Sequence, residues 1–392
     1  MDHLVKQLFL KNKEEGRILA GHPWVFSNEV REVKGSPNIG DVVELVAASG
    51  KSLGVGFYNP HSLISFRLLS TEVEEIDTEF FQKRILQALE LRRKLYPANE
   101  TFRLVYGESD FLPGLIVDKF NDYLSVQTFS YGMDARLQTV CDILESLLHP
   151  KGIVERNESP LRELERLPQK KGVLSGSIDT TIIEDGDVKF AVDVFEGQKT
   201  GFFLDQRENR YTIRRFSPNA DVLDCFSNEG AFALHAAKAG ANSVLGIDVS
   251  AEAVRRASEN ARLNKLVNVN FEQADVFDKV KQLASNGKKF DVIVLDPPSF
   301  TKSKKNVLPA KQGYKELHAS AFRALKKNGI LLTASCSHHI ESEVFLDIVD
   351  STARKLGRTI QLLDWRGAGP DHPVLPAMPE TRYLKFAVVR VL

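Results

Sequence analysis

The fold of this chain is decided by the stretch DVLDCFSNEGAF, residues 221–232. Its first half is apolar enough for a strand that is buried on both faces, which is typical of a parallel sheet. In its second half, Gly230 and other small residues let a ligand approach the N-terminus of the following helix closely. Because only one glycine occupies the turn, the dinucleotide fingerprint G-x-G-x-x-G is absent. The stretch therefore favours a nucleoside cofactor without a pyrophosphate over NAD or FAD.

Two further strand ends continue the predicted cofactor site. The next strand ends at Asp248, where a carboxylate can accept hydrogen bonds from both ribose hydroxyls. Ser250 is then the expected N-cap of the following helix. The third strand ends shortly before Asp275, for which two roles stay open. Its carboxylate or the neighbouring amide could meet an adenine edge, or the carboxylate could cap the next helix.

Strand and helix patterns alternate from about residue 181 to the end of the chain. This alternation predicts an α/β fold with a mostly parallel sheet that helices cover on both faces. The predicted strands are 221–226, 243–248, 268–273, 290–296, 329–335, 359–365 and 383–391. Ligands bind such sheets outside the carboxyl ends of the strands, so the residues that follow the strands are the candidates for chemistry.

Two neighbouring strand ends of this pattern carry a carboxylate and a thiol. One strand ends in DPPSF, residues 296–300, and another is followed by SCS, residues 335–337. The two prolines restrict the backbone after Asp296 and so fix the direction of its carboxylate. The carboxylate of Asp296 and the thiol of Cys336 could contact a planar substrate from two sides. The pairing suggests covalent chemistry on a nucleobase.

Cys336 is the candidate nucleophile among the three cysteines of the chain. Cys225 lies inside the predicted cofactor strand, and Cys141 lies on the apolar face of a predicted helix. A buried structural role is the alternative for Cys336. A free thiol has a pKa of about 8.5, so it needs nearby positive charge or hydrogen bonds to ionise at neutral pH.

The first 180 residues contain two different patterns. Up to about residue 72, short β-type runs alternate with Gly and Pro turns, which predicts a small β-barrel. The next segment combines helical periodicity at 77–95 and 134–148 with strands such as 114–118 and 124–128. We therefore expect three domains: a barrel at 1–72, a small α+β middle domain at 73–180 and the α/β domain at 181–392.

The composition is that of a globular protein, with 43% hydrophobic and 27% charged residues among 392. Lys and Arg total 52, as do Asp and Glu, so the overall charge gives no support for nonspecific binding to polyanions. No run approaches the roughly 20 apolar residues of a membrane span, and the N-terminus lacks the apolar core of a signal peptide. Three widely separated cysteines argue for a reducing compartment. We expect a cytoplasmic protein with no membrane partner and no metal site.

The motifs taken in order resemble a known family. Residues 224–232, 246–248, 275 and 296–298 are similar to the motifs of class I S-adenosylmethionine-dependent methyltransferases. Over nearly the whole chain, three further segments resemble the ribosomal RNA large-subunit methyltransferase I family, namely 197–207, 299–300 and 335–337. Residues 21–26 and 54–60 resemble the PUA domain of that family, which is an RNA-binding barrel.

The resemblance implies a cofactor, a substrate and a strand order. Members of this family methylate carbon 5 of cytosine in 23S rRNA with S-adenosylmethionine as the methyl donor. The implied strand order is 3-2-1-4-5-7-6, with the last strand antiparallel. In this reading Asp248 binds the ribose, and Gln206 belongs to a segment that touches both cofactor and target. The full set of expected cofactor contacts is Gln206, Asp224, Phe226, Asn228, Gly230, Asp248, Asp275 and Asp296.

The resemblance also suggests a mechanism. Adding the Cys336 thiolate to carbon 6 would make carbon 5 nucleophilic enough to attack the methyl group, and the carbon-5 proton must then leave. Asp296 could hydrogen-bond the exocyclic amine and N3 of cytosine. We nominate Glu380 as the proton acceptor, with a water molecule as the competitor. Phe300 would stack on the base, and the lysines after it would hold flanking phosphates, namely Lys302, Lys304 and Lys305.

Several alternatives stay open at this point. The RNA could be tRNA rather than 23S rRNA, and the chain could form a homodimer. A guanine or adenine methyltransferase, acting at N2 or N7 in the case of guanine, is the alternative enzyme, because Asp-Pro-Pro followed by an aromatic residue resembles the motif of amino-methyltransferases. Those enzymes need no thiol, so Cys336 discriminates between the two. A non-catalytic RNA-binding factor of ribosome assembly is the third reading.

Overall fold

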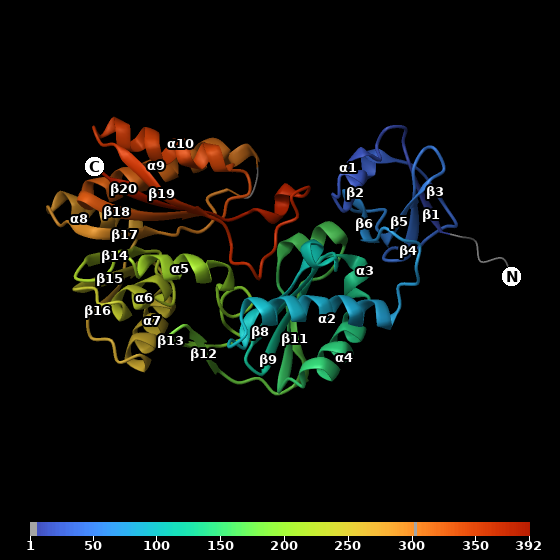
Figure 1. Ribbon diagram of the computed structural model, residues 1–392, viewed down its shortest axis with the longest axis horizontal. Helices are drawn as coiled ribbons and strands as arrows, with labels where there is room; N and C mark the ends of the chain where they lie inside the picture. Colours follow the sequence, from blue (N-terminus) through green and yellow to red (C-terminus); the bar gives the residue numbers. More distant parts are fainter. Residues whose placement is uncertain (1–5, 302–303) are drawn as a thin grey trace. The chain divides into compact units, whose positions relative to one another are not determined.

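The computed structural model describes residues 6–301 and 304–392, and the chain forms two compact units (Figure 1). The N-terminal unit contains the chain up to Ile183 together with Ala191–Leu204 and Pro370–Thr381. The C-terminal unit contains Glu184–Phe190, Asp205–Gly369 and Arg382–Leu392. The proposed domain boundaries at 72 and 180 stay a prediction. No helix in the described part of the chain is long and apolar enough to cross a membrane.

A six-stranded mixed sheet forms the first part of the N-terminal unit. Its strand order is β2-β6-β5-β4-β1-β3, and β1 runs parallel to β4 but antiparallel to β3. Apolar residues alternate along the strands, so that Leu8 and Leu10 of β1 are buried while their neighbours are half-buried. The elements are β1 (Gln7–Leu10), α1 (Gly16–Leu19), β2 (Trp24–Phe26), η1 (Ser27–Glu29), β3 (Val30–Lys34), β4 (Val42–Val46), β5 (Ser52–Tyr58) and β6 (Ile64–Ser70).

A five-stranded sheet with two long helices forms the middle of the N-terminal unit. The strand order is β11-β10-β9-β8-β7, and α2 and α4 share one apolar core cluster with the sheet. Asp77 caps α2 by accepting a hydrogen bond from the backbone of Phe80. The elements are α2 (Thr78–Leu95), β7 (Thr101–Tyr106), η2 (Gly107–Asp110), β8 (Leu115–Phe120), β9 (Tyr123–Thr128), α3 (Tyr131–Asp134), α4 (Leu137–Leu148), β10 (Gly152–Asn157), η3 (Pro160–Glu165) and β11 (Lys170–Gly176).

A buried polar cluster joins these two sheets. The carboxylate of Glu165 accepts hydrogen bonds from Asn59 Nδ2 at 2.8 Å, Ser62 Oγ at 2.6 Å and Arg67 Nη2 at 3.0 Å. Arg67 also pairs with Glu108, which accepts a hydrogen bond from the Trp24 indole. Because the donors come from the six-stranded sheet or its loops and both carboxylates from the middle of the unit, the cluster fixes one against the other.

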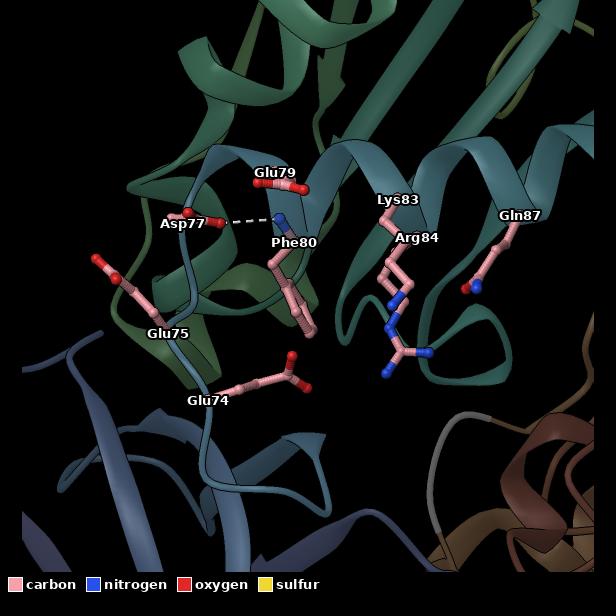
Figure 2. A pocket seen from close by; sticks show the side chains of 8 residues that line it. All are labelled: Glu74, Glu75, Asp77, Glu79, Phe80, Lys83, Arg84 and Gln87. Carbon is pink, nitrogen blue, oxygen red and sulfur yellow. Dashed lines mark hydrogen bonds between the residues drawn. The ribbon is translucent and has the colours of Figure 1, made fainter.

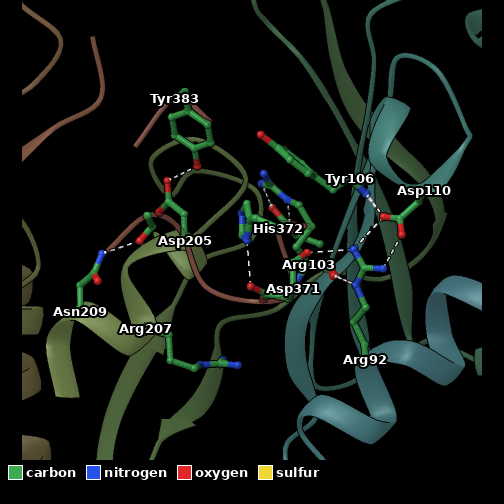
Figure 3. Close-up of polar contacts among 12 residues, drawn as sticks. Arg92, Arg103, Tyr106, Asp110, Asp205, Arg207, Asn209, Asp371, His372 and Tyr383 are labelled. Atoms are coloured by element: carbon green, nitrogen blue, oxygen red, sulfur yellow. Dashed lines mark hydrogen bonds and ion pairs between the residues drawn. The ribbon is translucent and has the colours of Figure 1, made fainter. Parts of the chain in front are cut away.

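The segment Pro370–Thr381 belongs to the N-terminal unit through hydrogen bonds near its start. Figure 3 shows Arg92 paired with Asp110, and the same guanidinium donates to the Asp371 carbonyl oxygen at 2.8 Å. The backbone amide of Arg103 donates to the Asp371 carboxylate at 3.0 Å. His372 hydrogen-bonds that carboxylate and packs its ring against Tyr106. This segment is therefore structured by residues that lie 279 and 268 positions earlier in the chain.

A pocket of about 310 Å³ lies beside the first turns of α2 in the same unit (Figure 2). Glu74 and Glu75 line it from the linker that precedes the helix, and Lys83 and Arg84 line it from the helix. Small organic ligands bind pockets that are mostly apolar. The charges of both signs in this pocket are instead typical of a solvated surface.

The C-terminal unit contains the predicted α/β sheet. Its strand order is β16-β15-β14-β17-β18-β20-β19, and β20 runs antiparallel to both of its neighbours. The predicted order 3-2-1-4-5-7-6 is therefore confirmed. The strands are β14 (Asp221–Cys225), β15 (Ser243–Asp248), β16 (Val269–Gln273), β17 (Phe290–Leu295), β18 (Leu325–Ser335), β19 (Ile360–Arg366) and β20 (Lys385–Val391).

Helices flank this sheet, as an α/β fold requires (Figure 1). They are α5 (Arg207–Ile213), α6 (Ala231–Lys238), α7 (Ala251–Leu263), α8 (Val276–Ser285), α9 (Val307–Ala324) and α10 (Ser342–Lys355). Shorter elements complete the chain, namely η4 (Leu204–Gln206), η5 (Lys304–Asn306), η6 (Pro379–Thr381) and a two-stranded sheet of β12 (Thr181–Asp185) and β13 (Val188–Val192). Strands β14, β17 and β18 are almost wholly buried at their carboxyl halves, which places their ends beside one another in a rigid sheet.

Candidate functional site

The loop between β14 and α6 has an unusual backbone. Phe226, Asn228 and Gly230 have φ angles of +62°, +46° and +82°, which lie in the left-handed region. At Gly230 a Cβ atom would lie 2.6 Å from Cζ of Phe271, so only glycine fits there. Left-handed non-glycine residues cost energy and gather at ligand sites. The predicted cofactor loop is thus held in one strained conformation.

Asp248 at the end of β15 holds this loop in place. Its Oδ2 accepts a hydrogen bond from the backbone amide of Asn228, and its Oδ1 accepts one from that of Ser250, both at 2.9 Å. Ser250 caps α7 through the amide of Ala253, as predicted. Each carboxylate oxygen can accept a second hydrogen bond. Asp248 can therefore fix the loop and receive the two hydroxyls of a ribose at the same time.

The carboxyl group of Asp224 lies fully buried beneath the loop. Its Oδ2 accepts a hydrogen bond from the amide of Ala233 at 3.0 Å, and its Oδ1 has no hydrogen-bond partner among the described residues. The buried hydroxyl of Ser227 has no partner among them either. Burial, together with the charges of Asp296 and Asp248, raises the pKa of Asp224 well above its usual value. Two buried polar groups without a partner among the described residues, beside a strained loop, can hydrogen-bond a ligand.

Asp275 caps the helix that follows it. Its side chain accepts a hydrogen bond from the amide of Asp278 at 3.1 Å, at the N-terminus of α8. Capping was one of the two roles that the sequence left open. The other, contact with an adenine edge, stays a prediction.

Gln206 and Asp296 meet in the C-terminal unit although 90 residues separate them. The Gln206 amide donates to Asp296 Oδ2 at 3.0 Å, and its oxygen accepts from Asn209 at 2.7 Å. Gln206 is only 4% exposed, so its orientation is set by these contacts. The structure thereby brings together a predicted cofactor contact and the carboxylate at the end of β17. In the segment 197–207, the residues up to Leu204 belong to the other unit.

Cys336 lies directly after β18 with a half-buried side chain. The residues on either side of it are tied to surrounding elements. Ser335 Oγ accepts a hydrogen bond from the Tyr314 hydroxyl at 2.9 Å, and Ser337 Oγ accepts one from the amide of Phe300 at 3.2 Å. The first bond ties the end of β18 to α9, and the second connects residues 335–337 (the thiol loop) with residues 296–300 that follow β17. These contacts fix the residues on either side of Cys336.

Phe300 belongs to an aromatic cluster behind these loops. Its ring centroid lies 4.5 Å from that of Tyr314 and 6.0 Å from that of Phe277. Burial raises the pKa of Tyr314 to about 12, so its hydroxyl stays a neutral donor at physiological pH. Stacking of a base on Phe300 stays a prediction.

Lys385 is a residue of this site that the sequence analysis missed. It opens β20, is 4% exposed, and donates hydrogen bonds to the carbonyl oxygens of Ser337 and Tyr383, each at 2.8 Å. Figure 3 shows the Tyr383 hydroxyl donating in turn to Asp205. A lysine at the start of the otherwise apolar run 384–389 was the available signal, because a buried strand rarely contains an unpaired charge.

The predicted proton acceptor and the predicted phosphate-binding lysines have no described contact with the residues above. Glu380, on η6, belongs to the N-terminal unit, and its carboxylate lies 3.5 Å from His22 Nε2. Lys302 lies outside the described residues. Lys304 belongs to η5, and Lys305 in the same turn is exposed. Among the described residues no cluster of His, Cys, Asp and Glu could hold a metal ion.

Two family models match the chain. Residues 8–71 match a PUA-like domain, and residues 216–365 match a methyltransferase domain. Curated relatives match over nearly the full length. "Ribosomal RNA large subunit methyltransferase I" of Tolumonas auensis is 39% identical, with 98% of this chain and 99% of the relative covered. The protein of the same name from Shewanella denitrificans is 40% identical, with 97% and 98% covered.

Solved structures share the fold along the chain. A protein of Streptococcus mutans described as a SAM-dependent methyltransferase superimposes with a TM-score of 0.83 at 20% identity, with 98% of this chain and 99% of that chain covered. SMU.776, which is described as a methyltransferase and was solved in complex with SAH, superimposes with a TM-score of 0.85 at 20% identity and the same coverage. At this identity the likeness concerns the fold.

Proposed function

The chain belongs to the ribosomal RNA large subunit methyltransferase I family, and from that premise we propose that it forms 5-methylcytosine in 23S rRNA through a covalent adduct of Cys336. It is an S-adenosylmethionine-dependent methyltransferase of large-subunit ribosomal RNA with a PUA-like domain. The observation that carries the proposal is the half-buried thiol of Cys336, which follows β18 between two serines whose hydroxyls are hydrogen-bonded to Phe300 and Tyr314.

When bound, S-adenosylmethionine supplies an electrophilic methyl group on a sulfonium centre. Asp248 would receive the ribose hydroxyls, and Asp275 would lie at the adenine. The buried carboxyl of Asp224 and the hydroxyl of Ser227 offer unmatched polar atoms to the charged methionine portion. Phe226 and Gly230 would line the same portion, and the other expected cofactor contacts are Asn228, Gln206 and Asp296.

Cys336 acts on the target base. Its thiolate adds to carbon 6 of cytosine, which converts carbon 5 into an enamine-like nucleophile that can accept a methyl group. Asp296 bonds the exocyclic amine and N3, and assists protonation at N3 during the addition. Gln206 holds the Asp296 carboxylate by its 3.0 Å hydrogen bond, so that the carboxylate keeps one orientation before the base arrives.

The carbon-5 proton must leave before the thiolate can be eliminated. Glu380 is our nominee for the acceptor, and water is the competitor. Glu380 is 45% exposed and lies beside His22, so it is accessible to a substrate. Replacing Glu380 by Gln distinguishes the two, since a water acceptor would leave methylation unchanged and a carboxylate acceptor would trap the adduct.

The RNA would contact both halves of the chain. The PUA-like domain is the expected docking module, and Phe300 would stack on the extruded base. Lys302, Lys304 and Lys305 would neutralise flanking phosphates, which positions RNA without reading its sequence. A chain that methylates ribosomal RNA works where ribosomes assemble, so we propose a cytoplasmic location.

Nucleoside mass spectrometry of rRNA and tRNA from cells with and without this protein tests the proposal. We expect one 5-methylcytosine to disappear from 23S rRNA and to return with the wild-type chain but not with Cys336→Ala. Cys141→Ala is the matched control, because that thiol is buried in the core of the N-terminal unit. Loss of a methylguanine instead would favour an amino-methyltransferase, and loss from tRNA alone would keep the mechanism but change the substrate.

A further inference from the structure

Lys385 lies next to the thiol loop, and it has no role in the proposed methylation mechanism. In the antiparallel register of β18 and β20 it lies opposite Ser335, the last residue before Cys336. Its ammonium group donates to the carbonyl oxygen of Ser337, the first residue after Cys336. Lys385 therefore contacts the thiol loop from both sides of the cysteine.

The buried ammonium group donates hydrogen bonds to the carbonyl oxygens of Ser337 and Tyr383, and no carboxylate among the described residues accepts one from it. Burying a cation is costly unless an opposite charge accompanies it. Burial lowers the pKa of Lys385 to about 8, and the negative charge of Cys336 acts in the opposite direction. Since the attraction between two charges is mutual, the same cation favours the thiolate.

Other titratable groups surround this pair. Tyr314 from α9 stays neutral, because its pKa is raised to about 12. Tyr383 donates its hydroxyl to Asp205, and His338 packs its ring on Tyr383 at 5.7 Å. Asp296 follows β17, the strand next to β18, and its carboxylate also acts on Tyr314. Lys385 brings an amine that can carry a positive charge to the loop around Cys336.

We propose that the ammonium group of Lys385 stabilises the thiolate of Cys336 and positions its loop for addition to a pyrimidine. The thiol loses its proton to solvent, and Lys385 keeps its own. The addition of this thiolate to cytosine rests on the proposed function. The stabilisation of the thiolate by Lys385 does not depend on that function. Lys385 is a positioning residue, because it acts through Cys336 rather than on the base.

The test is the pH dependence of Cys336 alkylation by iodoacetamide in the full-length chain, without cofactor or RNA, followed by peptide mass spectrometry. We expect a wild-type midpoint below the ordinary thiol value of about 8.5. Lys385→Met should raise the midpoint by about one unit, which slows alkylation about tenfold at pH 7. Lys385→Arg, which keeps the charge, should restore most of the difference. Cys141 and Cys225 do not interfere, since burial raises the pKa of both thiols.

Lys326→Met is the matched control. Lys326 also lies on the sheet, but it pairs with Asp291 and Asp221, so its loss should leave the midpoint unchanged. A wild-type midpoint at or above 8.5 would overturn the proposal without any variant, which matters if Lys385→Met fails to fold. An equal midpoint in the wild type and Lys385→Met would overturn it as well. If Cys336→Ala still methylates RNA, the proposed function fails while the alkylation result stands.

Discussion

Glu165→Gln tests whether the buried polar cluster holds the PUA-like sheet against the middle of the N-terminal unit. The Glu165 carboxylate is 3% exposed and accepts hydrogen bonds from Asn59, Ser62 and Arg67. A glutamine keeps one acceptor oxygen but presents an NH₂ group to the remaining donors. At least one buried donor then lacks an acceptor, and Arg67 loses one of its two carboxylates.

The expected loss in the free energy of unfolding is about 3 kcal/mol. A hydrogen bond to a charged group contributes roughly 1.5–3 kcal/mol, and an unsatisfied buried donor costs roughly 1–3 kcal/mol. Breaking a buried ion pair costs about 3–5 kcal/mol, and the lower end applies because Glu108 still binds Arg67. With an m-value of about 2 kcal/mol per molar urea, the midpoint should fall by about 1.5 M.

Urea unfolding followed by Trp24 fluorescence measures this effect. The chain has two tryptophans, so a Trp365→Phe background leaves Trp24 as the single reporter within the N-terminal unit. Glu163→Gln, two residues earlier on η3 and exposed, is the control and should change stability by less than about 0.5 kcal/mol. Equal midpoints for the two variants would refute the reasoning, because the cluster would then carry no net stabilisation.

Three further predictions concern the C-terminal unit. Asp248→Asn should weaken S-adenosylmethionine binding at least about tenfold in calorimetry. The reason is that an asparagine side chain cannot accept hydrogen bonds from both loop amides and two ribose hydroxyls. Unchanged affinity would contradict the ribose role of Asp248. Gly230→Ala should lower stability by about 1–3 kcal/mol in thermal unfolding, since its Cβ meets Phe271 and φ is positive; a wild-type Tm would be inconsistent with this geometry. Tyr314→Phe should lower the methylation rate while cofactor affinity stays constant, because the Tyr314 hydroxyl hydrogen-bonds Ser335 next to Cys336. A parallel loss of cofactor affinity would contradict this and indicate that the fold of the unit is disrupted.

Local patterns of the sequence determined most of the C-terminal unit. Buried strands, helical periodicity and capping residues are local properties, and the ends of β14, β15, β17 and β18 fall within a few residues of their predicted positions. The motifs at these strand ends were visible because a parallel sheet collects its ligand contacts at the carboxyl ends of its strands. The strand order came from resemblance to a family, since periodicity does not reveal which strands are neighbours.

Contacts between residues far apart in the chain could not be predicted from local patterns of the sequence. Gln206 and Asp296 are 90 residues apart, and Arg67 and Glu165 are 98 apart. The assignment of Pro370–Thr381 to the N-terminal unit depends on hydrogen bonds to Arg92 and Arg103. Each of these side chains is polar and would be expected at the surface from sequence alone. Burial with a matched partner is a property of the folded chain, because it exists only once the backbone has brought donor and acceptor together.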